Sequence, residues 1–431
     1  MEFEAQVKRL ESENFRLRRA VEELSVLNDV ATAVSGTSTV TEVVDLIVQK
    51  CVKNVRVEQG AVLMLDQQEE SAPLKTMIRK VQSDFAGIPY RLGDQITGWM
   101  IKNQQPLLIA DLSDDSRFRM PPEGAKMRNL LCVPLRLKGR MLGVLAVFNK
   151  LAGEDFSESD QRLLTIIAAQ SAQVIENARL YEEEQNLVRL ETELHTARDI
   201  QRKLLPKAPP SIEGWDVAGR SEPARSVGGD YFDYLDGGSG RTGICVADVS
   251  GKGISASLVM AAVQATIRSQ SLTGLPVAEQ TGHANRLLFD STDSDKFVTM
   301  FYSSLDPATG DMSYTNAGHN PPAVFRAGSD EPQLLEEGGP VLGVLPQAPF
   351  GEAAVQLDPG DVLLLYTDGI SEAMDVDDEE YGEERLYEVF RANRNESSAA
   401  LVDRVFAAVK DFCTGAPQTD DMSMVIVRRK A

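Results

Sequence analysis

The sequence has 431 residues, of which 42% are hydrophobic and 25% are charged, a composition typical of two or three globular domains. It contains no run of about 18 apolar residues, which excludes a membrane span. Charged residues run through positions 1–19 and do not fit a signal peptide, so we expect a cytoplasmic protein. The net charge is −21, and residues 206–431 hold 35 acidic and 17 basic residues. A domain this acidic repels nucleic acid, so that class of partner is excluded.

Residues 1–28 follow a heptad pattern, and they predict an N-terminal coiled-coil helix. Leucine at d with some β-branched residues at a favours a two-stranded parallel coil, and asparagine at a fixes its register. The alternative is a single amphipathic helix packed on its own domain. We expect a homodimer. The d positions are Phe3, Leu10, Leu17 and Leu24, and the a positions are Val7, Asn14, Val21 and Asn28.

Residues 29–180 predict an α+β domain. An opening helix at 40–52 precedes a strand at 60–66, and two later strands at 129–137 and 140–150 are joined by Lys138-Gly139. A short glycine-containing link between apolar runs predicts a hairpin. A closing helix follows, with Ser157 as its expected N-cap.

This segment resembles a GAF domain, a fold for small-molecule sensing and dimerisation. The matching blocks are ITGWMIKNQQPLLIAD, LCVPL and GVLAVFNK, followed by FSESD. Cyclic-nucleotide-binding members carry a motif that Asn149, Lys150, Phe156 and Asp160 match, whereas Gln161 replaces its glutamate. These four residues are the candidate ligand site, and the ligand stays open between a cyclic nucleotide, another small molecule and none.

Residues 181–206 predict a helical linker with a second coiled-coil seam, which ends at Pro206 because the segment PKAPP cannot continue a helix. The seam would join the two domains as a stiff rod. Its residues are Leu180, Leu187, Leu190, Leu194, Ala197 and Leu204.

Residues 207–431 predict a domain of packed antiparallel sheets, because many strands occur with few helical crossovers. Residues 306–311 are the expected turn of a hairpin. The predicted strands are 229–235, 242–250, 297–306, 310–318, 361–369 and 421–429, and the predicted helices are 254–271, 277–290 and 397–412.

The stretch GICVADVSGKGISAS, residues 243–257, has two interpretations. Gly251, Gly253 and Ala256 fit a dinucleotide-binding loop, whereas Asp248 fits a metal ligand at the end of a strand. A dinucleotide loop needs an acidic residue about 20 positions further on, at the end of a second parallel strand. Glu279 is acidic, but no strand leads into it, so the metal interpretation is favoured.

The metal interpretation is supported because several other aspartates have the same position relative to an apolar run. Asp230, Asp248 and Asp368 each lie at the end of an apolar run, and Asp420 and Asp421 precede another. Several carboxylates brought together by packed sheets repel one another unless cations lie between them. Hard oxygen ligands suit Mg²⁺ or Mn²⁺, and two such ions can clamp a phosphoryl group and activate a water.

Residues 193–431 resemble the bacterial PPM-type serine/threonine phosphatases of the SpoIIE/RsbU branch. The resemblance implies an αββα sandwich with a two-metal site at one end. The matching blocks, in chain order, are ARDIQRKLLP, PARSVGGDYFDY, VADVSGKGISASLVM, TMFYSSLD, YTNAGHNPP, GPVLGV, LYTDGISEA and TDDMSMVIV.

The resemblance also implies the role of each site residue. Asp248 would bridge both metals and the backbone carbonyl of Val249 would complete one coordination shell. Asp420 is expected as a ligand in preference to Asp421, since related phosphatases have asparagine at the second position. The implied catalytic and metal-binding carboxylates are Asp230, Asp248, Asp368 and Asp420, with Asp421 as the alternative.

Two further residues stand in matching blocks. Lys252 replaces a histidine of many relatives, and it would either steer an anionic phosphoprotein or be ordinary surface charge. His319 would be a general acid or, as the block implies in this branch, a structural residue near the site.

The function expected is a Mn²⁺/Mg²⁺-dependent phosphoserine/phosphothreonine protein phosphatase controlled by its GAF domain. The resemblance implies a phosphorylated STAS-type anti-sigma-factor antagonist as substrate, in partner-switching signalling of the stress-response kind. The alternatives are a non-catalytic regulator that docks a partner protein, and a sensor whose main output is dimerisation.

Overall fold

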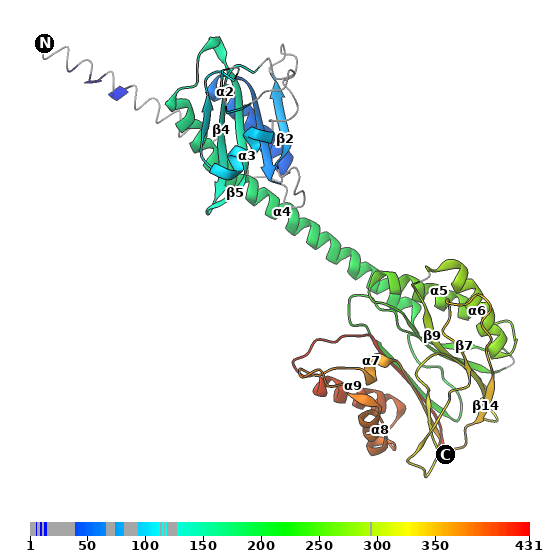
Figure 1. Ribbon diagram of the computed structural model, residues 1–431. Helices are drawn as coiled ribbons and strands as arrows, with labels where there is room; N and C mark the ends of the chain where they lie inside the picture. Colours follow the sequence, from blue (N-terminus) through cyan, green and yellow to red (C-terminus); the bar gives the residue numbers. More distant parts are fainter. Residues whose placement is uncertain are drawn as a thin grey trace. The chain divides into compact units, whose positions relative to one another are not determined.

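The computed structural model describes most of the chain, which divides into two compact units, Met1–Arg189 and Leu190–Ala431 (Figure 1). The predicted coiled coil at 1–28 lies outside the described residues except at five positions. No helix among the described residues is long and apolar enough to cross a membrane. The described residues are 6, 9, 10, 13, 14, 39–65, 74–81, 94–112, 114, 115, 117, 118, 127–238, 240–293 and 295–431.

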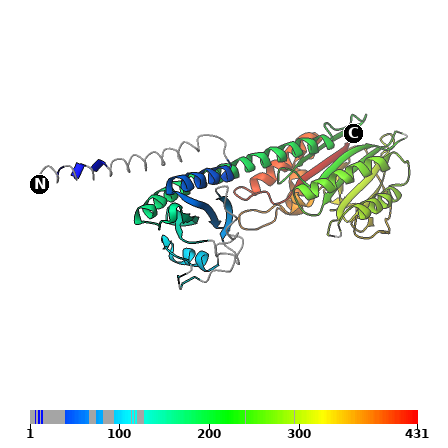
Figure 2. The same cartoon turned by 90° about the horizontal axis from the view of Figure 1, so that it is seen from above.

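The first unit is built on one antiparallel sheet with the strand order β2-β1-β5-β4-β3. Helices α2 and α4 pack on one face of this sheet, and Figure 2 shows α2 lying alongside α4. Helix α3 packs on the other face. The elements are α2 (Val40–Val55), β1 (Val57–Leu65), β2 (Leu74–Val81), α3 (Asp94–Asn103), β3 (Leu107–Ile109), β4 (Leu130–Leu137), β5 (Arg140–Lys150), a 3₁₀ turn (Leu151–Gly153) and α4 (Glu158–Leu204).

Local signals in the sequence determine the ends of these elements. Thr39 and Glu42 form a reciprocal capping box at the start of α2, which satisfies two backbone N–H groups that have no partner within the helix. Lys138 and Gly139 have φ values of 48° and 85°, the left-handed pair that a two-residue hairpin requires. Ser157 accepts a hydrogen bond from the Asp160 backbone N–H at 3.3 Å, so the predicted N-cap of the closing helix is present.

Helix α4 continues from the first unit into the second without a break. It has 47 residues and ends at Leu204, two residues before Pro206. Leu180, Leu187 and Leu190 are 51%, 58% and 52% exposed, which leaves an apolar stripe uncovered on the middle of the helix. The predicted seam therefore has an accessible face, and its partner stays a prediction.

The second unit contains two sheets. One has the order β13-β10-β9-β8-β7 with β14 paired to β10, and the other has the order β12-β11-β15-β16-β6. The strands are β6 (Trp215–Glu222), β7 (Tyr231–Asp236), β8 (Thr242–Val249), β9 (Val298–Leu305), β10 (Asp311–Ala317), β11 (Ala323–Phe325), β12 (Pro332–Leu334), β13 (Gly338–Gly339), β14 (Ala353–Gln356), β15 (Val362–Tyr366) and β16 (Met422–Arg429). The helices are α5 (Ile254–Ser271), α6 (Val277–Ser291), α7 (Asp368–Ser371), α8 (Gly382–Asn393) and α9 (Ser398–Phe412).

The two sheets pack face to face between pairs of helices (Figure 1). A shared core joins side chains of both sheets, including Phe232 and Phe301 from one and Leu363 and Val425 from the other. Helices α5 and α6 cover the outer face of the first sheet, and α8 and α9 cover the outer face of the second. Each sheet is thus apolar on both faces, which requires four layers.

In this unit the sequence predicted the strands β7, β8, β9, β10, β15 and β16 and the helices α5, α6 and α9, but it did not predict β6, β11 to β14, α7 or α8. The sequence predicts no helix between 290 and 397, yet α8 begins at Gly382, inside the acidic segment 375–384. Leu386, Tyr387 and Phe390 of this helix are buried at the spacing of one helical face. The start of this amphipathic helix was not recognised because its first residues lie in a dense run of charges.

We expect Phe390→Ala to destabilise the second unit by about 3–5 kcal/mol, because a fully buried aromatic ring leaves a cavity. Its ring stacks on Phe325 with 4.3 Å between centroids. The measurement is urea unfolding in a Trp99→Phe background, where fluorescence of the buried Trp215 reports on this unit alone. Exposed Glu388→Ala is the control and should change the free energy of unfolding by less than about 0.5 kcal/mol. A loss below about 1 kcal/mol for Phe390→Ala would contradict the packing of α8.

Candidate metal centre

The carboxylates converge because the inward-facing pattern of several strands continues past the apolar core. On β8, Ile244 and Val246 face the shared core, and Asp248 is the next residue with the same orientation. On β15, Leu365 faces that core and Thr367 follows it. One end of the space between the sheets is therefore lined by polar side chains.

Asp230 lies at this end, opposite Asp248. It immediately precedes β7, whose Tyr231 pairs with Ala247 of β8. Thr367 donates a hydrogen bond from Oγ1 to Asp230 Oδ2 at 2.8 Å, and the Ser423 backbone N–H donates to Thr367 Oγ1 at 2.9 Å. Thr367 thus connects the two sheets at the site, a role that the sequence analysis missed although the alternation along β15 indicates it.

Burial and mutual repulsion make these carboxylates weak acids. Burial, followed by the charges of Asp368 and Asp420, raises the pKa of Asp248 to about 7. Burial and then the charge of Asp248 raise the pKa of Asp230 well above its usual range. Burial and the charge of Asp420 also raise the pKa of Asp368. Like charges forced together in this way are stable when cations neutralise them.

Asp420 and Asp421 have different surroundings. Asp421 is only 4% exposed and accepts hydrogen bonds from the backbone N–H groups of Ala224 at 2.7 Å and Gly229 at 2.6 Å. Its carboxylate is thereby committed to holding the loop before Asp230. The side chain of Asp420 is 37% exposed and forms an ion pair with Lys252. Asp420 is therefore the more accessible of the two carboxylates, and its role as a ligand stays a prediction.

Lys252 contacts a candidate ligand directly, which neither of its two expected roles includes. Its Nζ lies 2.8 Å from Asp420 Oδ2 and donates to the Thr419 carbonyl oxygen at 2.6 Å. The flanking Gly251 and Gly253 have φ values of 90° and 79°, which residues with a side chain rarely adopt. The turn therefore holds the ammonium group of Lys252 against Asp420, a carboxylate that we expect to bind a metal ion.

Three glycines allow the backbone to pack tightly around the site. A Cβ on Gly228 would lie 2.4 Å from Asp421 Oδ2, one on Gly229 would lie 2.8 Å from the Val249 carbonyl oxygen, and one on Gly369 would lie 1.9 Å from the Asp421 carbonyl oxygen. No side chain fits at these distances. The carbonyl of Val249 thus lies close to the loop that carries Asp230.

The donor set fits hard divalent cations. Carboxylate and carbonyl oxygens are the ligands that Mg²⁺ and Mn²⁺ prefer, and the raised pKa values show that negative charge is in excess. Within the described part of the chain, no three His, Cys, Asp or Glu side chains already form a group that could hold a metal ion. Asp420 would have to exchange Lys252 for a cation, so binding requires side chains to reorient.

His319 is buried beside the site. Its Nδ1 lies 2.9 Å from Thr299 Oγ1, and Thr299 pairs with Asp248 across the β8–β9 ladder. Burial lowers the pKa of His319 to about 4, so the ring is neutral near pH 7. These contacts favour the structural interpretation of His319 over the general acid.

Arg225 was missed by the sequence analysis. Its guanidinium lies 3.8 Å from the position of a Cβ on Gly253, next to the metal turn. It belongs to the same block as Asp230, PARSVGGDYFDY. From the sequence, Asp230 of this block was considered as a site residue, but Arg225 was not. A positive side chain at this position can attract an anionic substrate.

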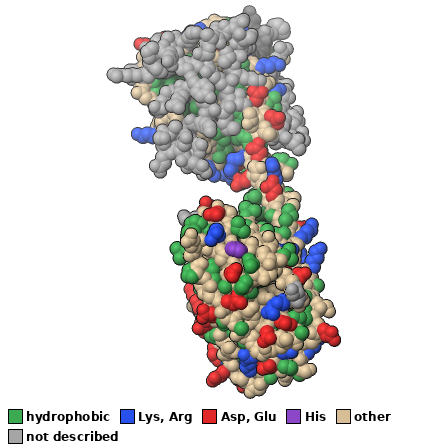
Figure 3. Space-filling model, turned by 90° about the vertical axis from the view of Figure 1, so that its right-hand side faces the viewer, with side chains coloured by type: hydrophobic (Ala, Val, Ile, Leu, Met, Phe, Trp, Pro, Cys, Tyr) green, Lys and Arg blue, Asp and Glu red, His purple; other side chains and the backbone are tan. Residues whose placement is uncertain are grey.

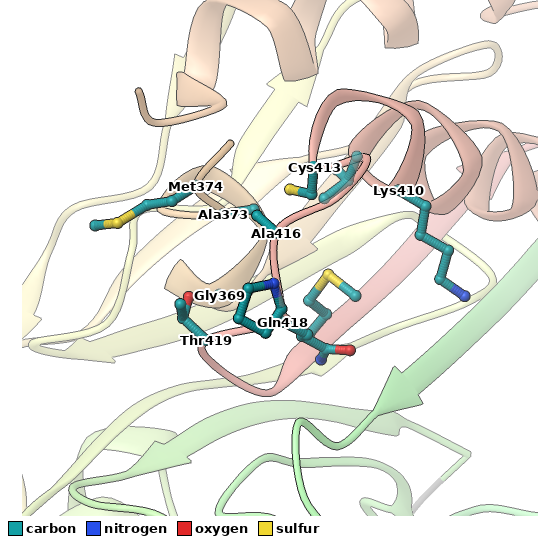
Figure 4. Close-up of a pocket in the computed structure, with 11 residues that line it drawn as sticks. Gly369, Ala373, Met374, Lys410, Cys413, Ala416, Gln418 and Thr419 are labelled. Atoms are coloured by element: carbon teal, nitrogen blue, oxygen red, sulfur yellow. The ribbon is translucent and has the colours of Figure 1, made fainter. Parts of the chain in front are cut away.

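A small pocket of about 120 Å³ is lined in part by Gly369 and Thr419, the sequence neighbours of Asp368 and Asp420. Figure 4 shows Gly369 and Thr419 close together, with Cys413 on another wall. Apolar groups of Ala373, Val409 and Met422 complete much of the lining. Backbone next to a cavity lacks packing partners on one side, so both segments have room to move there.

The candidate ligand residues of the first unit contact one another. Lys150 forms an ion pair with Asp160, and its Nζ lies 5.9 Å from the centroid of the Phe156 ring. Asn149 accepts a hydrogen bond from the Arg128 backbone N–H at 2.8 Å and donates to Glu58 Oε2 at 2.7 Å. These contacts support the fold of the unit, and ligand binding by these residues stays a prediction.

Comparison with known families matches both units. Residues 37–176 match the family described as GAF domain, and residues 238–430 match the family described as Stage II sporulation protein E (SpoIIE). The chain is similar to "Protein IcfG" of Synechocystis sp., with 30% identity over 55% of this chain and 41% of IcfG. It is similar to "Phosphoserine phosphatase RsbU" of Bacillus subtilis, with 26% identity over 58% of this chain and 75% of RsbU. The match thus spans less than half the length of IcfG.

A solved structure supports the fold of the second unit. The "SiaA-PP2C domain of Pseudomonas aeruginosa" superposes with a TM-score of 0.51 at 20% identity, over 56% of this chain and 98% of that domain. At this identity, the likeness concerns the fold alone.

We expect the metal-free protein to be more stable at pH 6 than at pH 8. Carboxylates with raised pKa values bind more protons in the folded state than in the unfolded state, so their contribution to stability falls as pH rises toward 8. A pKa of about 7 for Asp248 corresponds to a loss of about 1 kcal/mol over this interval. His319 has a lowered pKa, so it binds a proton only in the unfolded state as pH falls from 8 toward 6, and it opposes this trend by a smaller amount.

The measurement is the melting temperature in chelator, followed by Trp215 fluorescence in the Trp99→Phe background. Asp248→Asn should flatten the pH dependence, raise the melting temperature in chelator at pH 8 and reduce the stabilisation by added Mn²⁺. A wild-type protein that melts higher at pH 8 than at pH 6 in chelator would refute the assignment of repulsion to this cluster.

Proposed function

We propose that this chain, which joins a GAF domain to a SpoIIE-type PP2C phosphatase domain, is a Mn²⁺- or Mg²⁺-dependent phosphoserine/phosphothreonine protein phosphatase. The observation that carries the proposal is the convergence of Asp230, Asp248 and Asp368 at one end of the sandwich, with pKa values raised by burial and by neighbouring carboxylates. Two cations held there would stabilise the transferring phosphoryl group and supply an activated water.

The proposal assigns metal binding and the orientation of the ligands to different residues. Asp230, Asp248, Asp368 and Asp420 would hold the two ions, together with the carbonyl of Val249. Asp421 keeps its hydrogen bonds to the loop at 224–229 and so orients Asp230. The proposal needs no serine or cysteine nucleophile, in agreement with the burial of three of the four cysteines.

The proposed substrate is a phosphorylated STAS-type anti-sigma-factor antagonist in a partner-switching pathway. Support comes from the similarity to RsbU and RsbP of Bacillus subtilis, both named as phosphoserine phosphatases. The GAF domain would sense a small molecule and control the phosphatase through α4. The second candidate is a non-catalytic dimeric scaffold, which the exposed stripe of Leu180, Leu187 and Leu190 would serve equally well.

We expect purified protein to dephosphorylate phosphorylated STAS proteins with added Mn²⁺ and to lose this activity in chelator. Asp248→Asn should reduce turnover by at least about 10³-fold, because a bridging ligand is removed. Asp420→Asn should reduce turnover more than Asp421→Asn does. The measurement is phosphate release from a panel of phosphorylated STAS proteins, with circular dichroism as the control for folding.

The results of these measurements distinguish the phosphatase from the scaffold, and Asp420 from Asp421 as the ligand. Activity that survives exhaustive chelation, or a folded Asp248→Asn protein with near-normal turnover, would contradict the metal mechanism. Binding of a STAS protein without any turnover would favour the scaffold. A larger loss in Asp421→Asn than in Asp420→Asn would reverse the assignment of the two neighbours.

We expect insertions in α4 to distinguish a rigid coupling from a passive tether. Four residues inserted near Arg189 rotate the downstream helix by about 40° and interrupt the seam as a stutter, whereas seven nearly restore its phase. The four-residue insertion should change the basal phosphatase rate or its response to the GAF ligand, and the seven-residue insertion should stay close to wild type. The measurement is phosphatase rate, with light scattering for dimerisation. Wild-type rates and regulation in both dimers would show that α4 is a passive tether.

A further inference from the structure

A pocket of about 410 Å³ lies beside the metal centre and is lined in part by the end of α4. Arg198, Gln201 and Arg202 come from the last two turns of this helix. The remaining lining includes Arg220 to Pro223 of β6 and its following residue, Gly228, and the carboxylates of Asp230 and Asp421. All of these residues belong to the second unit. The pocket therefore extends the candidate active site toward the linker helix.

The end of α4 is held firmly in place against this pocket. Gln201 donates from Nε2 to the Gly228 carbonyl oxygen at 2.7 Å and accepts from the Gly228 N–H at 3.0 Å. The Leu204 carbonyl oxygen accepts hydrogen bonds from Gln264 and Arg268 of α5 at 3.4 Å each. Residues four apart lie on the same face of a helix, so Arg198 and Arg202 are presented side by side.

The charge of the third arginine is already neutralised. Arg220 forms ion pairs with Glu222 and with Asp403, and its guanidinium stacks 4.6 Å from the centroid of the Phe406 ring. Arg198 and Arg202, by contrast, have no side-chain hydrogen bond or ion pair to any residue in the described ranges. They are available for an external anion.

The remaining charges of the pocket favour an anionic group once the metal centre is loaded. Glu222 forms ion pairs with Arg220 and Lys410. Asp230 and Asp421 accept hydrogen bonds but form no ion pair within the described residues, and cations bound at the metal centre would offset their charge. Two free guanidinium groups then dominate the pocket, although the domain has 35 acidic and 17 basic residues. Figure 3 shows acidic side chains spread over one face of this unit. An acidic partner would be repelled by most of the surface and attracted at this pocket.

We propose that Arg198 and Arg202 recognise an acidic side chain of the protein substrate that lies close in sequence to the phosphorylated residue. The proposal rests on the proposed phosphatase function. Guanidinium groups match the planar, two-oxygen geometry of a carboxylate. A pocket of this volume is in the range that holds drug-sized ligands, so it has room for a phosphorylated residue and a neighbouring side chain. The two arginines are specificity residues that contact the substrate and take no part in bond breaking.

The test uses two synthetic phosphoserine peptides that differ only in whether aspartate or alanine flanks the phosphoserine. We expect the wild-type protein with Mn²⁺ to hydrolyse the aspartate peptide with about fivefold to tenfold higher kcat/KM. This preference should decrease with added salt, because the pairs are solvent-exposed. In Arg198→Gln/Arg202→Gln the ratio of the two kcat/KM values should fall to about one. Lys203→Gln removes the same charge from the same turn outside the pocket, and it should keep the wild-type ratio.

A wild-type ratio near one would overturn the proposal, as would a double variant that keeps the ratio or that loses activity on both peptides in parallel. Binding of fluorescent, non-hydrolysable phosphonate versions of both peptides, measured by anisotropy, provides a readout independent of turnover. A preference for the aspartate peptide in binding without hydrolysis of either peptide would refute the phosphatase and support recognition. Equal binding of the two peptides would refute recognition whatever the hydrolysis rates.

Discussion

Repulsion between buried carboxylates is the constraint on which the second unit depends. Asp230, Asp248 and Asp368 lie where two sheets approach each other, and burial and neighbouring charge raise the pKa of each. Such an arrangement opposes folding unless something else holds the strands together. The shared core of the two sheets, with Phe232, Phe301 and Leu363, supplies the apolar burial that offsets it. The site is therefore a strained end of a stable sandwich, as is common where residues are kept for chemistry.

The positions of the strands and of the principal carboxylates could be predicted because they follow from local pattern. The alternation on β8 that buries Ile244 and Val246 also orients Asp248, and the same reasoning applies to the other core strands. The predicted helix at 254–271 coincides with α5 (Ile254–Ser271). The apolar run of β8 ends before a glycine turn, and the small helix-forming residues of α5 begin directly after Gly253.

What could not be predicted depends on contacts between distant segments. The sequence alone did not show that Asp421 would be occupied by the backbone at Ala224 and Gly229, since those residues are almost 200 positions away. The pairing of Lys252 with Asp420 has the same origin. Helix α8 was missed for a different reason, because its first residues belong to the acidic segment 375–384. Periodicity is informative about which face is buried, but it does not identify the partner of a polar side chain.

Gly228, Gly229 and Gly369 make the neighbourhood of the site unusually intolerant of substitution. At each of these positions the first carbon of any side chain would collide with Asp421 or with the Val249 carbonyl at under 3 Å. One added methyl group would therefore push apart the loops that hold the carboxylates, without changing a single charge. A related chain that kept every aspartate but lost one of these glycines would carry the acidic residues of the site without the geometry that brings them together.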